Sequence, residues 1–334
     1  MLLRCLLILL VAFGSTSAPA RSRVPAARGR KAQRAAGRTA VRRPAKPLSD
    51  TLSPQQKQAE LIRRQEALGQ KVAVAVVSLR ADSLVFSRHA IEPMTPASNL
   101  KLLVAGAAWS CWDDTLVEAV RRKLGRRAFL HTQPRAAPRT RNRTRRTARP
   151  PEEDHAEANS QYITFPEQDS LSGLPGFDLL CRIGKLSDNY AANALLNCLV
   201  ARRNRPRFDV IRDCLAQNGI WDGGLNVEDG SGRSSRNRAT ALSLAQTLAR
   251  FWHANDRDVF VRALSVAGED GTLKRHDLRL GSRVQAKTGS IGGAYSLSGY
   301  LSRPDDTLAF SIILNQCYSK KSAFGFFADL LGTL

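Results

Sequence analysis

The chain has 334 residues, 43% hydrophobic and 6% aromatic, which is enough apolar material for one large core or two modest ones and excludes fibrous, collagen-like and wholly disordered proteins. Its net charge of +22 comes from two segments without acidic residues: residues 21–49 contain ten Lys or Arg, and residues 121–149 contain twelve. The remaining 29 basic residues balance 29 acidic ones, so the folded part is neutral and nucleic acid is not an expected partner.

The N-terminus has the pattern of a secretory signal peptide. A short charged start precedes ten apolar residues at positions 5–14, too few to span a bilayer, and the small residues Ala18 and Ala20 flank a cleavage position. We expect a signal peptide over residues 1–20, export to the periplasm, and no membrane span. The alternative, a buried N-terminal helix, is disfavoured by the Arg-rich stretch that follows. Residues 21–50, rich in Ala, Arg and Pro, predict a disordered basic leader.

The cysteines and histidines do not predict a metal or redox site. No pair of cysteines has Cys-x-x-Cys spacing, and the five histidines lack the spacing of metal ligands. We therefore expect no metal and no cofactor. Five cysteines remain after cleavage, and this odd number leaves at least one thiol unpaired or paired between chains. They are Cys111, Cys181, Cys198, Cys214 and Cys317.

The first half of the mature chain predicts three helices and a hairpin. The helices are expected over residues 53–68, 100–109 and 114–124, and the hairpin strands over 71–79 and 83–87. Thr95 as a cap and Pro96 as the first helical residue predict the start of the second helix. That helix is apolar all round, which predicts burial in the middle of a domain.

The pattern stops at an Arg-rich insert over residues 125–159, which we expect to be disordered. Helices are then expected over residues 177–184, 189–202, 209–218, 240–252 and 321–331, and strands over 283–288, 294–301 and 307–315. Short turns make these strands an antiparallel meander. Together with the hairpin they predict an α+β domain, over residues 51–124 and 160–334, with a five-stranded antiparallel sheet between helical clusters.

Three short motifs carry the chemistry: Ser98-x-x-Lys101, Ser187-Asp188-Asn189 and Lys287-Thr288-Gly289. Ser-x-x-Lys occurs by chance about once or twice in a chain of this length, whereas each tripeptide is expected in only about a few per cent of such chains. All three in this order behind a signal peptide indicate a serine acyl-transfer enzyme.

The first motif has the features of an activated nucleophile. In the first helical turn, unpaired N–H groups and the helix dipole favour an oxyanion at Ser98. Lys101 lies on the same face of an apolar helix, where burial and a nearby Lys287 would lower its pKa. The pair therefore predicts an amine that accepts the Ser98 proton. The alternative is an ordinary serine beside a lysine that extends to solvent.

The other two motifs predict substrate contacts. Lys287 and Gly289 share one face of a strand whose edge can pair with an extended peptide, and Lys287 offers charge to a substrate carboxylate. Gly289 lets a substrate backbone approach. Ser187 can relay a proton to the leaving group and Asn189 can bind a substrate amide, although such a cluster is most often a helix cap. Gly-x-Ser-x-Gly, His-Glu-x-x-His and phosphate-loop motifs do not occur.

The strings PASNLK at 96–101, KLSDN at 185–189, DGSG at 229–232 and AKTGS at 286–290, with SGY at 298–300, resemble the S13 peptidases. These are low-molecular-mass class C penicillin-binding proteins, D-alanyl-D-alanine carboxypeptidases/endopeptidases with the penicillin-recognising fold. The resemblance covers roughly residues 55–125 and 170–334.

The resemblance implies that Ser98 is acylated, that Lys101 is its base, and that Lys287 and Thr288 line the site. The oxyanion would be bound by the backbone N–H groups of Ser98 and Ser290. The implied partners are peptidoglycan peptide stems, with β-lactams as covalent inhibitors.

One feature departs from the family, because only 88 residues lie between Ser98 and Ser187 and the family's two insert domains are largely missing. The Arg-rich stretch is either a natural linker left by a deletion or the product of a local reading-frame change. Two other hypotheses are a catalytically impaired homologue whose basic segments bind cell-wall polymer, and a β-lactamase, which needs a deacylating carboxylate such as Glu228 or Asp229 beside the site.

Overall fold

The computed structural model describes residues 51–125, 176–220, 223–255 and 257–334. The predicted signal peptide and basic leader, and the Arg-rich insert beyond residue 125, lie outside these residues. Within the described residues, none of the helices combines the length and the apolar character needed to cross a membrane.

The centre of the fold is an antiparallel sheet with the strand order β2-β1-β6-β5-β4-β3. Its strands are β1 (Lys71–Ser78), β2 (Ser83–Arg88), β3 (Ser265–Val266), β4 (Val284–Ile291), β5 (Ala294–Ser302) and β6 (Thr307–Asn315). The hairpin and the meander join through β1 and β6, as expected. The sheet has six strands rather than five, because β3 adds two residues, too few to leave a periodic pattern in the sequence.

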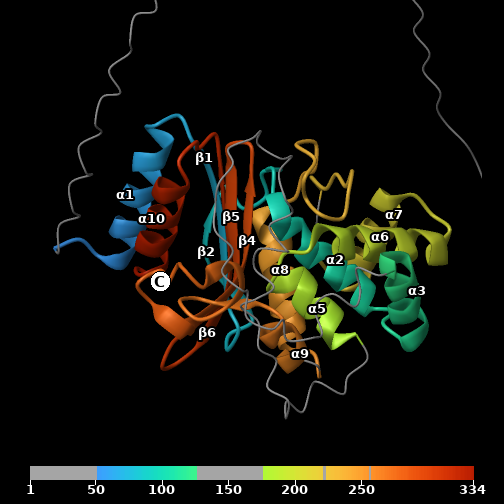
Figure 1. Cartoon of the computed structure of the whole chain (residues 1–334). Helices are drawn as coiled ribbons and strands as arrows, with labels where there is room; N and C mark the ends of the chain where they lie inside the picture. The colour runs from blue at the N-terminus through green and yellow to red at the C-terminus, as the bar shows by residue number, and fades with distance from the viewer. Residues whose placement is uncertain (1–50, 126–175, 221–222, 256) are drawn as a thin grey trace, which may run out of the picture. The chain divides into compact units, whose positions relative to one another are not determined.

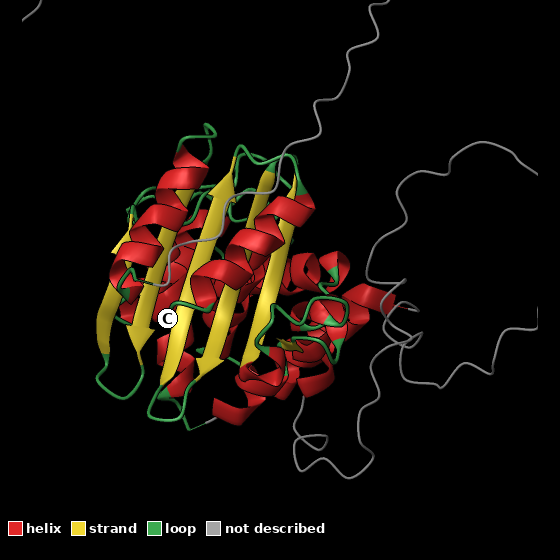
Figure 2. Ribbon diagram, turned by 90° about the vertical axis from the view of Figure 1, so that its left-hand side faces the viewer, coloured by secondary structure: helices red, strands yellow, loops and turns green. Residues whose placement is uncertain are grey.

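Helices cover both faces of the sheet (Figures 1 and 2). One face is covered by α1 (Pro54–Glu66) and α10 (Lys320–Leu331), and the other by α8 (Ala241–Trp252), with α2 (Leu100–Trp109) packed against α8. The remaining helices are α3 (Asp114–Leu124), α5 (Phe177–Gly184), α6 (Asn189–Arg203), α7 (Arg207–Gln217) and α9 (Arg257–Arg262). The sequence did not predict α9, a helix of six residues.

The residues of β1 show why the two faces differ. Val72, Val74 and Val76 pack into the core beneath α1 and α10, whereas Ala73 and Ala75 face the cluster that contains α2 and α8. Alternate residues of a strand point to opposite faces. The small side chains allow α8 to lie close to the strands β1 and β6.

The start of α2 differs from the prediction. Thr95 does not cap the helix. Its side-chain hydroxyl accepts a hydrogen bond from Arg238 at 3.2 Å, and its backbone N–H and C=O are bonded to the side-chain amide of Asn315 on β6, at 2.9 and 3.1 Å. A 3₁₀ turn, η1 (Ala97–Asn99), precedes α2 instead. The residue after Pro96, Ala97, has a φ of +48°, a strained value for a residue with a Cβ atom. This strain lies directly before Ser98.

Candidate active site

Ser98 and Lys101 are in direct contact. The Lys101 Nζ atom lies 2.9 Å from the Ser98 Oγ atom, and the lysine is fully buried while the serine is half-buried. The 3₁₀ turn places Ser98 just before α2, so that Lys101 lies one turn further along on the same side. The structure therefore joins these two residues as the sequence predicted.

Two carbonyl oxygens bind Lys101 as well. Its Nζ atom lies 2.8 Å from Asn189 Oδ1 and 2.6 Å from the backbone oxygen of Ser231. Carbonyl oxygens only accept hydrogen bonds, whereas a serine hydroxyl donates or accepts. Lys101 Nζ thus donates to all three oxygens, and the Ser98 hydroxyl donates to the Ser231 backbone oxygen at 3.4 Å.

The Ser187-Asp188-Asn189 motif acts as a helix cap and also reaches the site. The Asp188 carboxylate accepts a hydrogen bond from Ala191 N–H at the start of α6 and forms a buried ion pair with Arg182 at 2.5 Å. This arrangement holds Asn189 against Lys101. Ser187 has a φ of +60°, and its hydroxyl group has no hydrogen-bond partner among the described residues, so it is free to turn toward a ligand.

Lys287 on β4 is fully buried in the neighbourhood of Lys101. Burial, and secondly the charge of Lys101, hold the pKa of Lys287 well below its ordinary value. Its Nζ atom donates to the backbone oxygen of Thr288 at 2.9 Å. Burial and the neighbouring Lys101 thus both oppose the protonated form of Lys287.

Gly289 shares the sheet face of Lys287, as predicted, but the structure gives another reason for the glycine. A Cβ atom at this position would lie 2.2 Å from Ser296 Oγ and 2.9 Å from the backbone oxygen of Pro96. The close approach that requires a glycine is therefore made by the chain itself, where β4 packs against the turn that carries Ser98.

The free edge of β4 begins near the site. The strand β3 pairs only with Gln285 and Ala286, and the Val284 carbonyl faces it, because that oxygen accepts the Ala267 N–H at 3.0 Å. Backbone groups alternate in direction along a strand. The N–H of the exposed Ser290 therefore points to the same side, beyond the end of β3.

The turn at residues 229–232 supplies the Ser231 carbonyl, a contact of Lys101 that was not predicted from the sequence. Backbone N–H groups of residues 231–234, the Ser231 hydroxyl and the Asn237 amide all donate to the Asp229 carboxylate. Burial opposes ionisation of Asp229, but these hydrogen bonds outweigh it and lower its pKa. Gly232 has a φ of +81°, and a Cβ there would lie 2.0 Å from the Ala97 carbonyl oxygen. The Asp-Gly-Ser-Gly string was the available clue.

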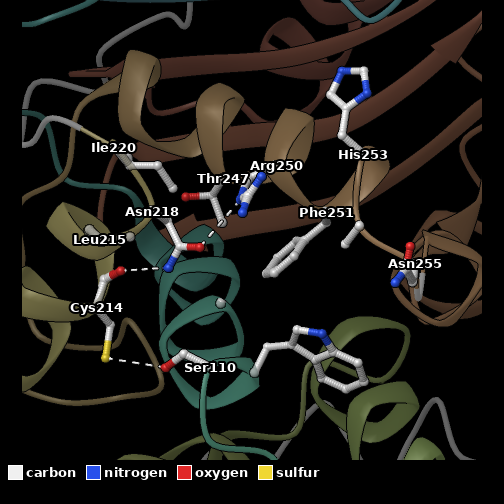
Figure 3. A pocket seen from close by; sticks show the side chains of 13 residues that line it. Ser110, Cys214, Leu215, Asn218, Ile220, Thr247, Arg250, Phe251, His253 and Asn255 are labelled. Atoms are coloured by element: carbon white, nitrogen blue, oxygen red, sulfur yellow. Dashed lines mark hydrogen bonds between the residues drawn. The ribbon is translucent and has the colours of Figure 1, made fainter.

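Two cavities adjoin this region. The smaller, of about 20 Å³, lies against Lys101 and Lys287 and is otherwise lined by apolar residues and Gly184. The larger, of about 310 Å³, lies between α2, α7 and α8 and contains none of the predicted site residues. In Figure 3, Phe251 points into the larger pocket, and this ring lines both cavities. Phe251 therefore separates the buried lysines from the larger pocket.

Neither metal ligands nor disulfides contribute to the described part of the chain. No three His, Cys, Asp or Glu side chains come together there as possible metal ligands. All five cysteines after residue 110 are free thiols.

Residues 171–324 match the D-Ala-D-Ala carboxypeptidase 3 (S13) family. The chain is 35% identical over 112 residues to a D-alanyl-D-alanine carboxypeptidase of Actinomadura sp. (strain R39), and 30% identical over 149 residues to the D-alanyl-D-alanine carboxypeptidase DacB of Haemophilus influenzae. These alignments cover 31% and 41% of this chain but only 21% and 31% of the two relatives, so the chain matches less than a third of their length.

Solved structures show the same fold. Penicillin binding protein 4 of Haemophilus influenzae, in a complex with a β-lactam, aligns with a TM-score of 0.59 at 16% identity, over 83% of this chain and 98% of that one. A β-lactamase of Sphaerobacter thermophilus aligns with a TM-score of 0.51 at 17% identity, over 83% and 95%. All three motifs lie in one domain, and over residues 171–324 the chain is similar to the D-Ala-D-Ala carboxypeptidase 3 (S13) family.

Proposed function

We propose that this chain is an exported, penicillin-sensitive serine D,D-carboxypeptidase/endopeptidase that hydrolyses D-Ala-D-Ala bonds of peptidoglycan through an acyl-enzyme on Ser98. One observation carries the proposal. The Nζ atom of Lys101 lies within 3 Å of both Ser98 Oγ and Asn189 Oδ1, although Asn189 is 88 residues away in the sequence. Lys287 is also buried on this side of the sheet. The S13 relatives, both named as D-alanyl-D-alanine carboxypeptidases, support the substrate class.

The acylation step follows from the contacts of Lys101. Neutral Lys101 takes the proton from the Ser98 hydroxyl, and Ser98 Oγ attacks the carbonyl carbon of the scissile peptide bond. Such a base contributes about 10²–10⁴ in rate. The backbone N–H groups of Ser98 and Ser290 bind the developing oxyanion, and each such donor is worth about 10²–10³.

Breakdown of the tetrahedral intermediate expels D-alanine, whose nitrogen needs a proton. Lys101 supplies it, and the half-buried Ser187 hydroxyl relays it, since that group is not held by another described residue. Asn189 positions Lys101 and offers its side-chain N–H groups to the substrate amide. Water then attacks the acyl-enzyme by the same proton path and releases Ser98.

A β-lactamase needs a carboxylate that activates water for rapid deacylation, and within the described part of the chain the carboxylates nearest the site are engaged elsewhere. Asp229 accepts hydrogen bonds from its own turn, Asp188 pairs with Arg182, and Glu228 pairs with Arg236. We therefore favour a slowly deacylating peptidase over a β-lactamase. A homologue that only binds cell-wall polymer would not need a buried Lys101 in contact with a serine hydroxyl.

Labelling with a fluorescent penicillin tests the proposal. The wild-type protein should form a covalent adduct that survives denaturation, and Ser98→Ala should abolish it. The control Ser110→Ala removes a serine hydroxyl at the other end of α2 and should label normally. Absence of an adduct in folded wild-type protein contradicts the proposal, whereas rapid turnover of a chromogenic cephalosporin would favour the β-lactamase.

Export to the periplasm is the corresponding proposal for localisation, and it rests on the pattern of residues 1–20. The N-terminal sequence of protein recovered from a periplasmic fraction tests it. Cleavage after Ala20 is the expected result, and protein that retains residues 1–20 in the cytoplasm contradicts it.

A further inference from the structure

A chain of hydroxyl groups leads away from Thr288, the middle residue of the Lys-Thr-Gly motif. Its Oγ1 atom lies 2.8 Å from Thr272 Oγ1, which lies 3.2 Å from the buried Ser265 Oγ, and Ser265 donates to the backbone oxygen of Lys185 at 3.2 Å. Lys185 lies two residues before Ser187. These linked hydroxyl groups therefore connect two of the three motifs beneath the site.

The residues that carry these hydroxyl groups are held rigidly. Asp270 accepts the Val266 N–H at 2.7 Å and forms an ion pair with the Lys185 side chain, which joins β3 to the loop that carries Ser187. Gly271 has a φ of +54°, and a Cβ there would lie 2.3 Å from Ser265 Oγ and 2.8 Å from the Lys185 carbonyl oxygen. Only glycine allows this turn to bring the Thr272 hydroxyl between Ser265 and Thr288.

The hydroxyl protons can be arranged in two ways. In the first, Thr288 donates to Thr272, Thr272 to Ser265, and Ser265 to the Lys185 carbonyl, so that every O–H points away from the site. In the second, Ser265 donates to Thr272, Thr272 to Thr288, and the Thr288 O–H points outward. The contact between Thr272 and Ser265 allows either donor.

Reversal costs little in hydrogen bonds. The Lys185 carbonyl loses the Ser265 hydroxyl but keeps the Thr272 N–H at 3.1 Å, and the Ser265 oxygen keeps the same N–H at 3.1 Å. No covalent bond changes, because three hydroxyl groups only rotate. The second arrangement needs one acceptor beside Thr288, and an anion is the acceptor that gains most from an aligned chain of donors.

We propose that Thr272 is a positioning residue which, with Ser265, turns the Thr288 hydroxyl into a donor for the carboxylate of the ligand. This inference rests on the proposed function, in which the ligand is a peptide with a free C-terminal carboxylate or a β-lactam acid. The three O–H groups first point inward, and the carboxylate of the ligand reverses their direction. Thr272 acts through Thr288 and does not touch the ligand.

The test compares acylation by benzylpenicillin with acylation by its methyl ester, which lacks the carboxylate charge. Thr272→Val keeps the side-chain shape and removes the hydroxyl. We expect acylation by the acid to slow about threefold to tenfold, the worth of one hydrogen bond, with acylation by the ester nearly unchanged. Thr272→Ser should restore the wild-type ratio, and Thr247→Val, which removes a buried hydroxyl bonded to the Ser243 carbonyl within α8, should not alter it.

The outcomes separate the two proposals. If wild-type protein is not acylated, the proposed function fails. If wild-type protein is acylated and Thr272→Val slows acid and ester equally, or neither, the positioning role of Thr272 is wrong while the function stands. Should Thr272→Val not fold, Ser265→Ala breaks the chain one step further away, and a smaller loss of the acid-over-ester preference is then expected.

Discussion

The two faces of the sheet differ in composition and in role. Beneath α1 and α10 the core consists of large apolar residues such as Phe310, Ile312 and Phe327. The opposite face, toward α2 and α8, combines small apolar residues with fully buried polar ones, among them Lys101 and Lys287. The face beneath α1 and α10 therefore stabilises the fold through apolar burial. The face toward α2 and α8 contains buried polar groups, which are less favourable for stability but position the site.

The polar face also holds the turn that carries Ser98. Ser296 on β5 donates to the Pro96 carbonyl at 2.6 Å, and two residues further along the strand Ser298 accepts the Asn99 amide at 2.6 Å. These bonds flank Ser98 on both sides and fix the strained turn to the sheet. Hydrogen bonds from the strand thus set the geometry of the nucleophile, a task that apolar packing alone performs less specifically.

The largest effect should come from the polar face. Lys101→Met keeps much of the side-chain volume and removes the base, so acylation by penicillin should slow by about 10²–10⁴. The Asn189 and Ser231 oxygens lose their hydrogen bonds to Lys101 in this variant, which should also lower the free energy of unfolding. Stopped-flow labelling measures the rate, and Lys320→Met on α10 is the matched control on the other face. A Lys101→Met protein that acylates at the wild-type rate would remove Lys101 from the mechanism.

On the apolar face the largest effect should be on stability alone. Phe327 is fully buried in α10, and Phe327→Ala should lower the free energy of unfolding by about 3–5 kcal/mol through lost burial and the cavity left behind. Urea unfolding gives this value, and the acylation rate per folded molecule should stay at the wild-type level. An equal loss of rate would show that the two faces are not separable.

The same contrast explains what could be predicted from the sequence. Elements with their own periodicity, such as β6 over Thr307–Asn315, were located to the residue. The predicted cap at Thr95 was wrong because residues distant in the sequence bind Thr95: Arg238 donates to its hydroxyl, and Asn315 binds its backbone groups. Within the site, the contact of Lys101 with Ser98 follows from local spacing. The Ser231 carbonyl was missed because a backbone atom contributes no residue type to a motif.

The pH dependence of stability should come from Lys287. Burial and the nearby Lys101 lower its pKa well below 10.5, so between the lowered pKa and 10.5 the folded state binds fewer protons than the unfolded state. Over that pH window this lysine makes the free energy of unfolding rise with pH, by up to about 1.4 kcal/mol per pH unit. Below the lowered pKa, the full cost of burying a protonated Lys287 opposes folding. Lys287→Met should flatten this rise in urea unfolding at pH 7–10. An unchanged slope would contradict the lowered pKa.

The smallest effect tests whether a helix cap on the apolar face matters for the site. Ser53 caps α1 in a capping box with Gln56, and α1 carries no site residue. Ser53→Ala should therefore cost about 1 kcal/mol of stability and leave penicillin acylation unchanged. Asp188 caps α6 but also binds Arg182 and directs Asn189 to Lys101, so Asp188→Ala should lower both quantities. If both variants lose only stability, then the cap of α6 does not position the site, and the polar face is held in place by the sheet alone.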